Sequence, residues 1–188
     1  MTDVHLMAQQ ILLEHQSRRT PEFRDTPSLL LKDGGRIYGN EVIIPPAWIE
    51  AQATVLEYSW KGFQIDVAFP IGDKQLLMEI AVTYFIEPEK RRAVVKGDVA
   101  MIEIDLSGIL SKDLFDKEAF TAKVLSPGEL AVWINNPKGN ALVKKGRKLL
   151  EPQQLHQNSL ITKEEEKRAQ KEQRKVEKEL ERKKRIAE

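Results

Sequence analysis

The alternation of apolar and polar residues predicts strands in the middle of the chain. In the run 63–69, large apolar side chains alternate with polar or small ones, so that Asp66 points away from the aromatic face. The run 75–83 is almost wholly apolar, as in a strand that is covered on both sides, and Glu79 interrupts it. Short turns separate the runs, which favours an antiparallel meander. The predicted strands are 53–59, 63–69 and 75–83.

Helical spacing and turn residues predict the elements on either side. Apolar residues recur at helical spacing over 3–18, and Pro88 is well placed to begin a helix over 87–96. The apolar run 99–105 follows, and a strand, a helix and a second strand in this order form a right-handed crossover with a parallel pair. We therefore expect an α/β (α+β) fold with a mixed four- to five-stranded sheet flanked by helices. Further expected elements are a helix at 112–122, a strand at 130–134 and a turn at Asp33-Gly34-Gly35 within the Pro- and Gly-rich stretch 20–46.

The C-terminal end differs in composition from the rest of the chain. Residues 162–188 carry 11 Lys and Arg against 8 Asp and Glu, with hardly any large apolar side chain. Thr162 and Glu165 have the spacing of a capping box, which indicates the start of a helix. Asn136-Pro137 is expected to break the chain before a basic stretch. We therefore expect a globular domain over 1–150 and a tail over 151–188 with a long charged helix, solvated rather than coiled with a partner. Its helix-stabilising pairs are Glu164-Arg168, Glu179-Lys183 and Glu181-Arg185.

The composition limits the classes of function. The chain has 188 residues, no cysteine and a net charge of +1, which excludes thiol catalysis and zinc ribbons and requires any polyanion site to be local. No signal-peptide core is present, and no run approaches the roughly 20 apolar residues of a membrane span, so we expect a cytoplasmic protein. No P-loop, dinucleotide fingerprint or nucleophile elbow supports nucleotide hydrolysis, redox or acyl-transfer chemistry.

The carboxylates in the predicted strands suggest a metal site. Asp66 and Glu79 lie on neighbouring antiparallel strands, where they could converge on one divalent cation, and Glu57 on the preceding strand could add a third carboxylate. Mg²⁺ and Mn²⁺ prefer such oxygen ligands. A bound cation would lower the pKa of an attacking water and offset the charge of a phosphodiester. The alternative is that these acids are half-exposed or paired with a nearby Lys or Arg.

Short motifs surround the two central carboxylates. They are Phe63-Gln64-Ile65-Asp66-Val67, Met78-Glu79-Ile80-Ala81-Val82-Thr83, Glu89-Lys90 and Ile102-Glu103-Ile104-Asp105-Leu106-Ser107, with His5 on the first helix and Trp133-Ile134-Asn135-Asn136-Pro137-Lys138 downstream. Together they resemble the competence protein CoiA-like nuclease domains of the PD-(D/E)XK, or restriction-endonuclease-like, superfamily. The resemblance covers roughly residues 3–150. It implies a restriction-endonuclease-like, nuclease-like domain with Asp66 and Glu79 as metal ligands, assisted by the carbonyl of Ile80.

The chain departs from the superfamily pattern at one central position. The lysine that usually follows the second acid by two residues is replaced by Ala81. Lys90, about two helical turns later, could send its ammonium back toward the carboxylates, or it could be a surface residue. Thr83 could donate a hydrogen bond. His5 could act as a base or as a donor to phosphate, or it could simply be capped or solvated.

Basic and aromatic residues suggest contacts with nucleic acid. Lysines and arginines near residues 90 and 145 could hold a phosphate backbone, although such residues also serve solubility. Tryptophans could stack on unpaired bases, although most tryptophans at strand positions belong to the core. The basic residues are Lys90, Arg91, Arg92, Lys138, Lys144, Lys145, Arg147 and Lys148, and the tryptophans are Trp48, Trp60 and Trp133.

Three functions remain open from the sequence. The first is an Mg²⁺- or Mn²⁺-dependent nuclease, a hydrolase whose expected substrate is DNA. In this function Asp66 and Glu79 bind the metal, and Glu57, Lys90 and His5 are candidates for supporting roles. The second is a DNA-binding or recombination accessory protein that has lost catalysis. The third is a scaffold whose C-terminal helix binds a protein partner. The sequence does not indicate the oligomeric state.

Overall fold

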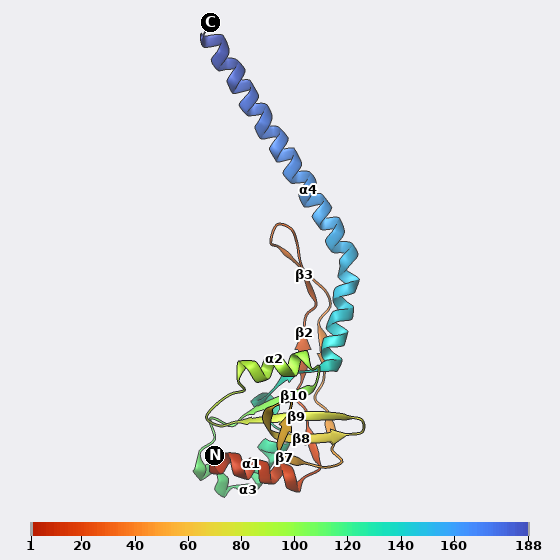
Figure 1. The fold of residues 1–188 in the computed structure, drawn as a ribbon, viewed down its shortest axis with the longest axis vertical. Coiled ribbons are helices and arrows are strands. Elements are labelled where there is room, and N and C mark those ends of the chain that lie inside the picture. The colour runs from red at the N-terminus through yellow and green to blue at the C-terminus, as the bar shows by residue number, and fades with distance from the viewer. Residues whose placement is uncertain (1, 188) are drawn as a thin grey trace. The chain divides into compact units, whose positions relative to one another are not determined.

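A computed structural model of the chain, which describes residues 2–187, is built around a five-stranded mixed sheet (Figure 1). The strand order is β11-β10-β9-β8-β7, in which β9 and β10 are parallel and all other neighbours are antiparallel. The α+β class and the mixed sheet predicted from the sequence are confirmed. The strands are β7 (Val55–Trp60), β8 (Phe63–Ile71), β9 (Lys74–Ala81), β10 (Ala100–Asp105) and β11 (Ala131–Asn135).

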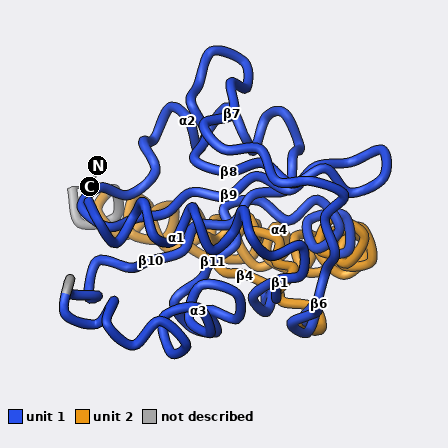
Figure 2. Tube along the Cα trace, turned by 90° about the horizontal axis from the view of Figure 1, so that it is seen from below, with its two compact units in different colours: residues 1–25, 42–142 blue, residues 26–41, 143–188 orange. Residues whose placement is uncertain are grey.

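Helices cover both faces of the sheet (Figures 1 and 2). On one face α1 (Asp3–Glu14) and α3 (Lys117–Leu125) bury apolar side chains such as Ile11 and Phe120 against Val67, Met78 and Ile102. On the other face α2 (Pro88–Lys96) packs Val94 against a second cluster of strand residues. These two clusters bury the alternate side chains of β8, β9 and β10, so the apolar run of β9 is explained by its central position.

The first helix is shorter than expected. The prediction of a helix over 3–18 is wrong at its end, because α1 stops at Glu14 and the next residues form β1 (Ser17–Arg19), paired with β6 (Trp48–Glu50). Arg18 in β1 is only 1% exposed, and its guanidinium carbon lies 3.5 Å from the centre of the Phe69 ring. Burial of this arginine against the sheet requires an extended chain at this point, which helical periodicity does not reveal.

The predicted helix at 112–122 is replaced by two shorter elements. A 3₁₀ turn, η1 (Ser111–Phe115), comes first, and α3 begins after Asp116, whose carboxylate accepts a hydrogen bond from the Ala119 amide. Asp116 is therefore an N-cap that divides the segment. A second 3₁₀ turn, η2 (Gly128–Leu130), leads into β11.

The C-terminal helix α4 (Pro137–Ala187) begins much earlier than the sequence suggested. Pro137 is its first residue rather than a break, since proline is well tolerated in the first turn of a helix. The predicted capping box at Thr162 is wrong, because Thr162 lies inside the helix and its hydroxyl donates to the Asn158 carbonyl at 2.9 Å. Side chains from 163 to 183 are all exposed. Two expected ion pairs form, Glu164–Arg168 at 3.9 Å and Glu179–Lys183 at 3.4 Å, whereas Glu181–Arg185 falls outside the described side chains.

Contacts divide the chain into two units. Unit 1 is Met1–Asp25 with Val42–Leu142 and contains the whole five-stranded sheet and the pair β2 (Phe23–Asp25) and β5 (Val42–Ile44). Unit 2 is Thr26–Glu41 with Val143–Glu188. It contains the hairpin of β3 (Ser28–Leu30) and β4 (Arg36–Tyr38), turned at Gly34 as predicted, and most of α4. None of the described helices has the length and apolarity that a membrane span requires.

Burial of Arg18 makes a testable contribution to stability. Its Nη2 donates to the carbonyls of His15 and Gln16, while Nε and Nη1 have no hydrogen-bond partner among the described residues. We expect Arg18→Ala to lower the free energy of unfolding by about 2–4 kcal/mol, because it leaves a cavity beside Phe69 and removes the guanidinium that donates to the His15 and Gln16 carbonyls. Urea denaturation measures this change. The neighbouring Arg19→Ala, at an exposed position, is the control and should change stability by less than about 0.5 kcal/mol. Equal effects of the two variants would contradict the assignment.

Candidate functional site

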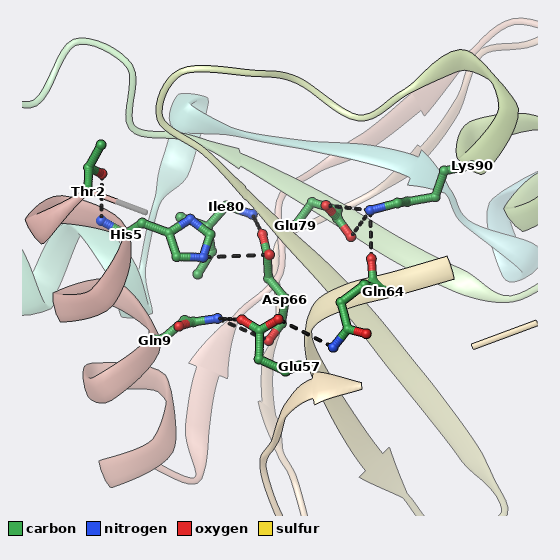
Figure 3. Close-up of polar contacts among 9 residues, drawn as sticks. All are labelled: Thr2, His5, Gln9, Glu57, Gln64, Asp66, Glu79, Ile80 and Lys90. Carbon is green, nitrogen blue, oxygen red and sulfur yellow. Dashed lines mark hydrogen bonds and ion pairs between the residues drawn. The ribbon is translucent and has the colours of Figure 1, made fainter. Parts of the chain in front are cut away.

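Strand register brings Asp66 and Glu79 together. The ladder of β8 and β9 ends at the pair of Val67 and Met78, and Asp66 and Glu79 are the next residues along their strands. The two side chains are 20% and 12% exposed and lie close together (Figure 3). The two carboxylates therefore meet beside the end of this ladder, where Asp66 is approached by His5 of α1 and Glu79 is in contact with Lys90 of α2.

Asp66 is held by the backbone of β9 and approached by α1. Its Oδ2 accepts a hydrogen bond of 2.8 Å from the Ile80 amide, and its Oδ1 lies 3.5 Å from Nε2 of His5. The first turn of α1 is fixed by the Thr2 hydroxyl, which accepts from the His5 amide. Nε2 of His5 is buried and has no hydrogen-bond partner among the described residues. The imidazole thus presents a free nitrogen to the carboxylate.

Glu57 joins the cluster from β7. The register of β7 and β8, which pairs Leu56 with Val67, places Glu57 opposite Asp66. Its backbone has φ 49, a left-handed conformation that is uncommon for a non-glycine residue. Gln9 donates to Glu57 Oε1 at 2.7 Å and to the Asp66 carbonyl at 3.4 Å, and Gln64 donates to Glu57 Oε2 at 3.3 Å. Two amides therefore fix this carboxylate beside Asp66.

Gln9 was missed by sequence reasoning. It is buried, 4% exposed, and lies four residues after His5, so both side chains are on the same side of α1. That spacing was the available signal, because a polar pair on the apolar side of an amphipathic helix needs a polar partner.

Lys90 supplies the ammonium of the site. From α2 its Nζ donates to both carboxylate oxygens of Glu79 at 3.1 Å and to the Gln64 carbonyl at 2.7 Å. Ala81 is buried two residues after Glu79, and alternation along β9 puts it on the Glu79 side of the sheet. Position 81 thus offers no ammonium, and the ammonium beside Glu79 belongs to Lys90 of α2. The structure therefore places Lys90 next to the carboxylates, which was one of its two predicted positions.

The environment raises the pKa of both central carboxyls. Burial raises the pKa of Glu79 to about 7, with a further increase from the charge of Asp66, while Lys90 opposes the shift. Burial also raises the pKa of Asp66, against the lowering effects of the Ile80 amide, His5 and Lys90. Near neutral pH the Glu79 carboxyl is therefore partly protonated, and a divalent cation beside the two acids would favour their ionised forms.

Asp66 and Glu79 line a pocket of about 580 Å³, and Figure 3 draws them with other lining residues such as His5, Gln64 and Lys90. Thr83 lines it, as do the loop residues after β9. None of the tryptophans among residues 2–187 lines this pocket: Trp60 belongs to the core and Trp133 donates its indole N–H to the Pro21 carbonyl. The basic residues 144–148 fall in unit 2, whereas Lys138 and those on α2 belong to unit 1. The residues that line the pocket are Thr2, His5, Gly62, Phe63, Gln64, Asp66, Glu79, Ile80, Val82, Thr83, Tyr84, Phe85, Glu87 and Lys90.

Two sets of side chains could hold a metal ion. His5, Glu57 and Asp66 each offer one ligand atom, and these three atoms lie within 4.8 Å of one another. The pair of Asp66 and Glu79 is the other set, but there Lys90 already contacts both Glu79 oxygens. The unpartnered Nε2 of His5 fits a ligand role. One imidazole with two carboxylates suits Mn²⁺ better than Mg²⁺, which favours oxygen alone.

Comparisons with protein-family models, curated proteins and solved structures found no match to this chain. The resemblance to the CoiA-like nucleases therefore stays a prediction that rests on the motifs themselves.

The raised pKa of Glu79 predicts a pH dependence of stability. Between its ordinary pKa of 4.5 and its folded value of about 7, the folded protein holds a proton that the unfolded chain has lost. The free energy of unfolding should therefore fall as pH rises through this window, by about 3 kcal/mol at most from this residue. Urea denaturation between about pH 5 and 8 should show a flatter profile for Glu79→Gln. Glu89→Gln, an exposed carboxylate of α2, is the control and should keep the wild-type slope. A wild-type profile in Glu79→Gln would argue against the shift.

Proposed function

We propose that unit 1 is a nuclease that hydrolyses phosphodiester bonds of nucleic acid with the help of a divalent cation, Mn²⁺ or Mg²⁺. DNA is the expected substrate. One observation carries the proposal: two carboxylates, an imidazole and an ammonium from four separate elements line a single open pocket, and Glu57 from a fifth element lies beside Asp66 (Figure 3). Such convergence of charged groups with raised pKa values is typical of active sites.

The acidic side of the pocket is suited to hold the cation. Glu57, Asp66 and His5 would be its ligands, with Gln9 keeping Glu57 in place. When bound, a divalent cation supplies two things: a lower pKa for a water molecule and compensation of the phosphate charge. The orientation of the ligands is fixed before binding, since Asp66 and Glu57 each accept hydrogen bonds from the protein.

The opposite side of the pocket is suited to proton transfer and phosphate binding. A carboxyl with a pKa of about 7, as in Glu79, is half ionised near neutral pH and can take the proton of the attacking water. The Lys90 ammonium can donate to a phosphate oxygen from its place beside Glu79. In this proposal Lys90 offsets the charge of the phosphate and Glu79 acts as the base, although position 81 carries an alanine.

Nuclease activity and its residue dependence are directly measurable. With Mn²⁺ and both single- and double-stranded DNA, we expect cleavage that falls by at least about 100-fold in Asp66→Asn and in Glu79→Gln, and by about 10-fold or more in Lys90→Met. Rates from labelled oligonucleotides separated on gels provide the measurement.

Matched variants on α2 serve as controls for this assay. Glu89→Gln and Lys96→Met remove exposed charges of the same kind outside the lining of the pocket and should cleave at the wild-type rate. Wild-type protein that binds DNA but never cleaves it would favour the accessory protein without catalysis. Cleavage that survives Asp66→Asn would indicate a contaminating enzyme and contradict the proposal.

Metal binding can be tested without activity. Isothermal titration with Mn²⁺ should show one site, weakened by about 10-fold or more in His5→Ala and in Glu57→Gln and by less in Glu79→Gln. His156→Ala, an exposed histidine of unit 2, is the control and should leave Mn²⁺ affinity unchanged. The opposite order, with Glu79→Gln abolishing binding and His5→Ala leaving it intact, would move the ion to the pair of Asp66 and Glu79.

A further inference from the structure

The loop between β9 and α2 displays two adjacent aromatic side chains at the pocket. Tyr84 is 85% exposed and Phe85 is 56% exposed, and both line the pocket that contains Asp66 and Glu79. A single exposed aromatic residue needs no explanation. Two in succession at the rim of a polar pocket leave a large apolar surface in water where a substrate would enter.

The loop is anchored at both ends, so the position of these side chains is defined. At its start the Ala81 carbonyl accepts a hydrogen bond of 2.7 Å from the Leu106 amide. At its end Ile86 enters the second core cluster, and its amide donates to Glu103 Oε1 at 2.6 Å. Glu103 itself is buried, 5% exposed, and is the partner of Glu79 in the parallel ladder of β9 and β10. The loop is thus tied to the strands that carry the site.

We propose that Tyr84 and Phe85 form a stacking platform for unpaired bases, so that the substrate is single-stranded nucleic acid or an unpaired segment of it. This inference rests on the proposed nuclease function and specifies its substrate. Within a duplex each base is stacked between its neighbours, whereas an unpaired base offers a free face to an aromatic ring. A strand with one base on this platform places its backbone over the pocket that Lys90 and the carboxylates line.

The expected occupant follows from the chemistry of the pocket. Carboxylates and an ammonium line it together with two exposed aromatic rings. With a divalent cation bound by the carboxylates, a ligand with alternating phosphates and flat bases matches both kinds of lining, while an apolar peptide would leave the charged groups without partners. The tryptophans that the sequence suggested for stacking are placed elsewhere, and the aromatic residues of the β9–α2 loop take that role.

Binding measured without cleavage tests the platform. In an Asp66→Asn background, fluorescence anisotropy with a labelled oligothymidylate and with a hairpin duplex separates the two substrate forms. We expect Tyr84→Ala and Phe85→Ala each to weaken single-strand binding by about 10-fold and duplex binding by less than about 2-fold. Tyr84→Trp should retain single-strand affinity. Phe115→Ala removes an aromatic side chain that is 92% exposed and lies outside the lining of the pocket, and it should leave both affinities unchanged.

Each outcome supports or overturns the inference. Equal losses for duplex and single strand, no loss for either, or an equal loss in Phe115→Ala would overturn it. Thermal melting of every variant identifies unfolded protein, and Tyr84→Trp provides a second, folded test of the same position. Cleavage of duplex alone, unaffected by Tyr84→Ala, would contradict the stacking platform and support the nuclease function. Single-strand binding that depends on Tyr84 and Phe85, with no cleavage by the wild-type protein, would support the platform and contradict the nuclease function.

Discussion

The structure depends on how two like charges are kept side by side in the interior of a sheet. Asp66 and Glu79 lie just beyond the last pair of the β8–β9 ladder, where burial disfavours ionisation of both and the charge of Asp66 adds to this effect at Glu79. The chain compensates with groups from three directions: the Ile80 amide of the sheet, His5 of α1 and Lys90 of α2. Asp66 is thus compensated by the Ile80 amide and by His5, whereas Lys90 contacts both oxygens of Glu79.

The same arrangement sets up a competition at Glu79. Lys90 contacts both of its oxygens and also the Gln64 carbonyl, so the ammonium is fixed by more than one acceptor. A cation placed between Asp66 and Glu79 would have to share Glu79 with this lysine. A cation placed among His5, Glu57 and Asp66 would not, and the positive charge of Lys90 would then remain available to a phosphate. The expectation that His5 and Glu57 contribute more than Glu79 to Mn²⁺ affinity therefore follows from the contact between Lys90 and Glu79.

Sequence patterns predicted the parts of the fold that follow local rules. Alternation identified β8 and β9, and the strand after α2 was correctly expected to pair in parallel with β9. Errors arose where a distant contact decided the conformation. Arg18 is extended because Phe69 lies beside it, and Pro137 begins α4 although its type alone suggested a break.

Site prediction shows the same division between local and distant information. The acids were identified because a charge interrupts an apolar strand, and that signal is present in the sequence. The approach of Lys90 to Glu79 was one of two open alternatives, since it depends on how α2 packs on the sheet. The contact between Gln9 and Glu57 joins residues 48 positions apart, and no local pattern specifies it. The exposure of the aromatic pair on the β9–α2 loop was not predicted, because adjacent aromatic residues are as typical of a core as of a surface.

The backbone at Glu57 holds a residue with a side chain in a conformation that favours glycine. A left-handed residue with a side chain is less stable than glycine in the same place by roughly 1 kcal/mol. Glycine would relax this strand but would remove the carboxylate that Gln9 and Gln64 hold. A more stable version of β7 would therefore be one without the carboxylate that lies beside Asp66.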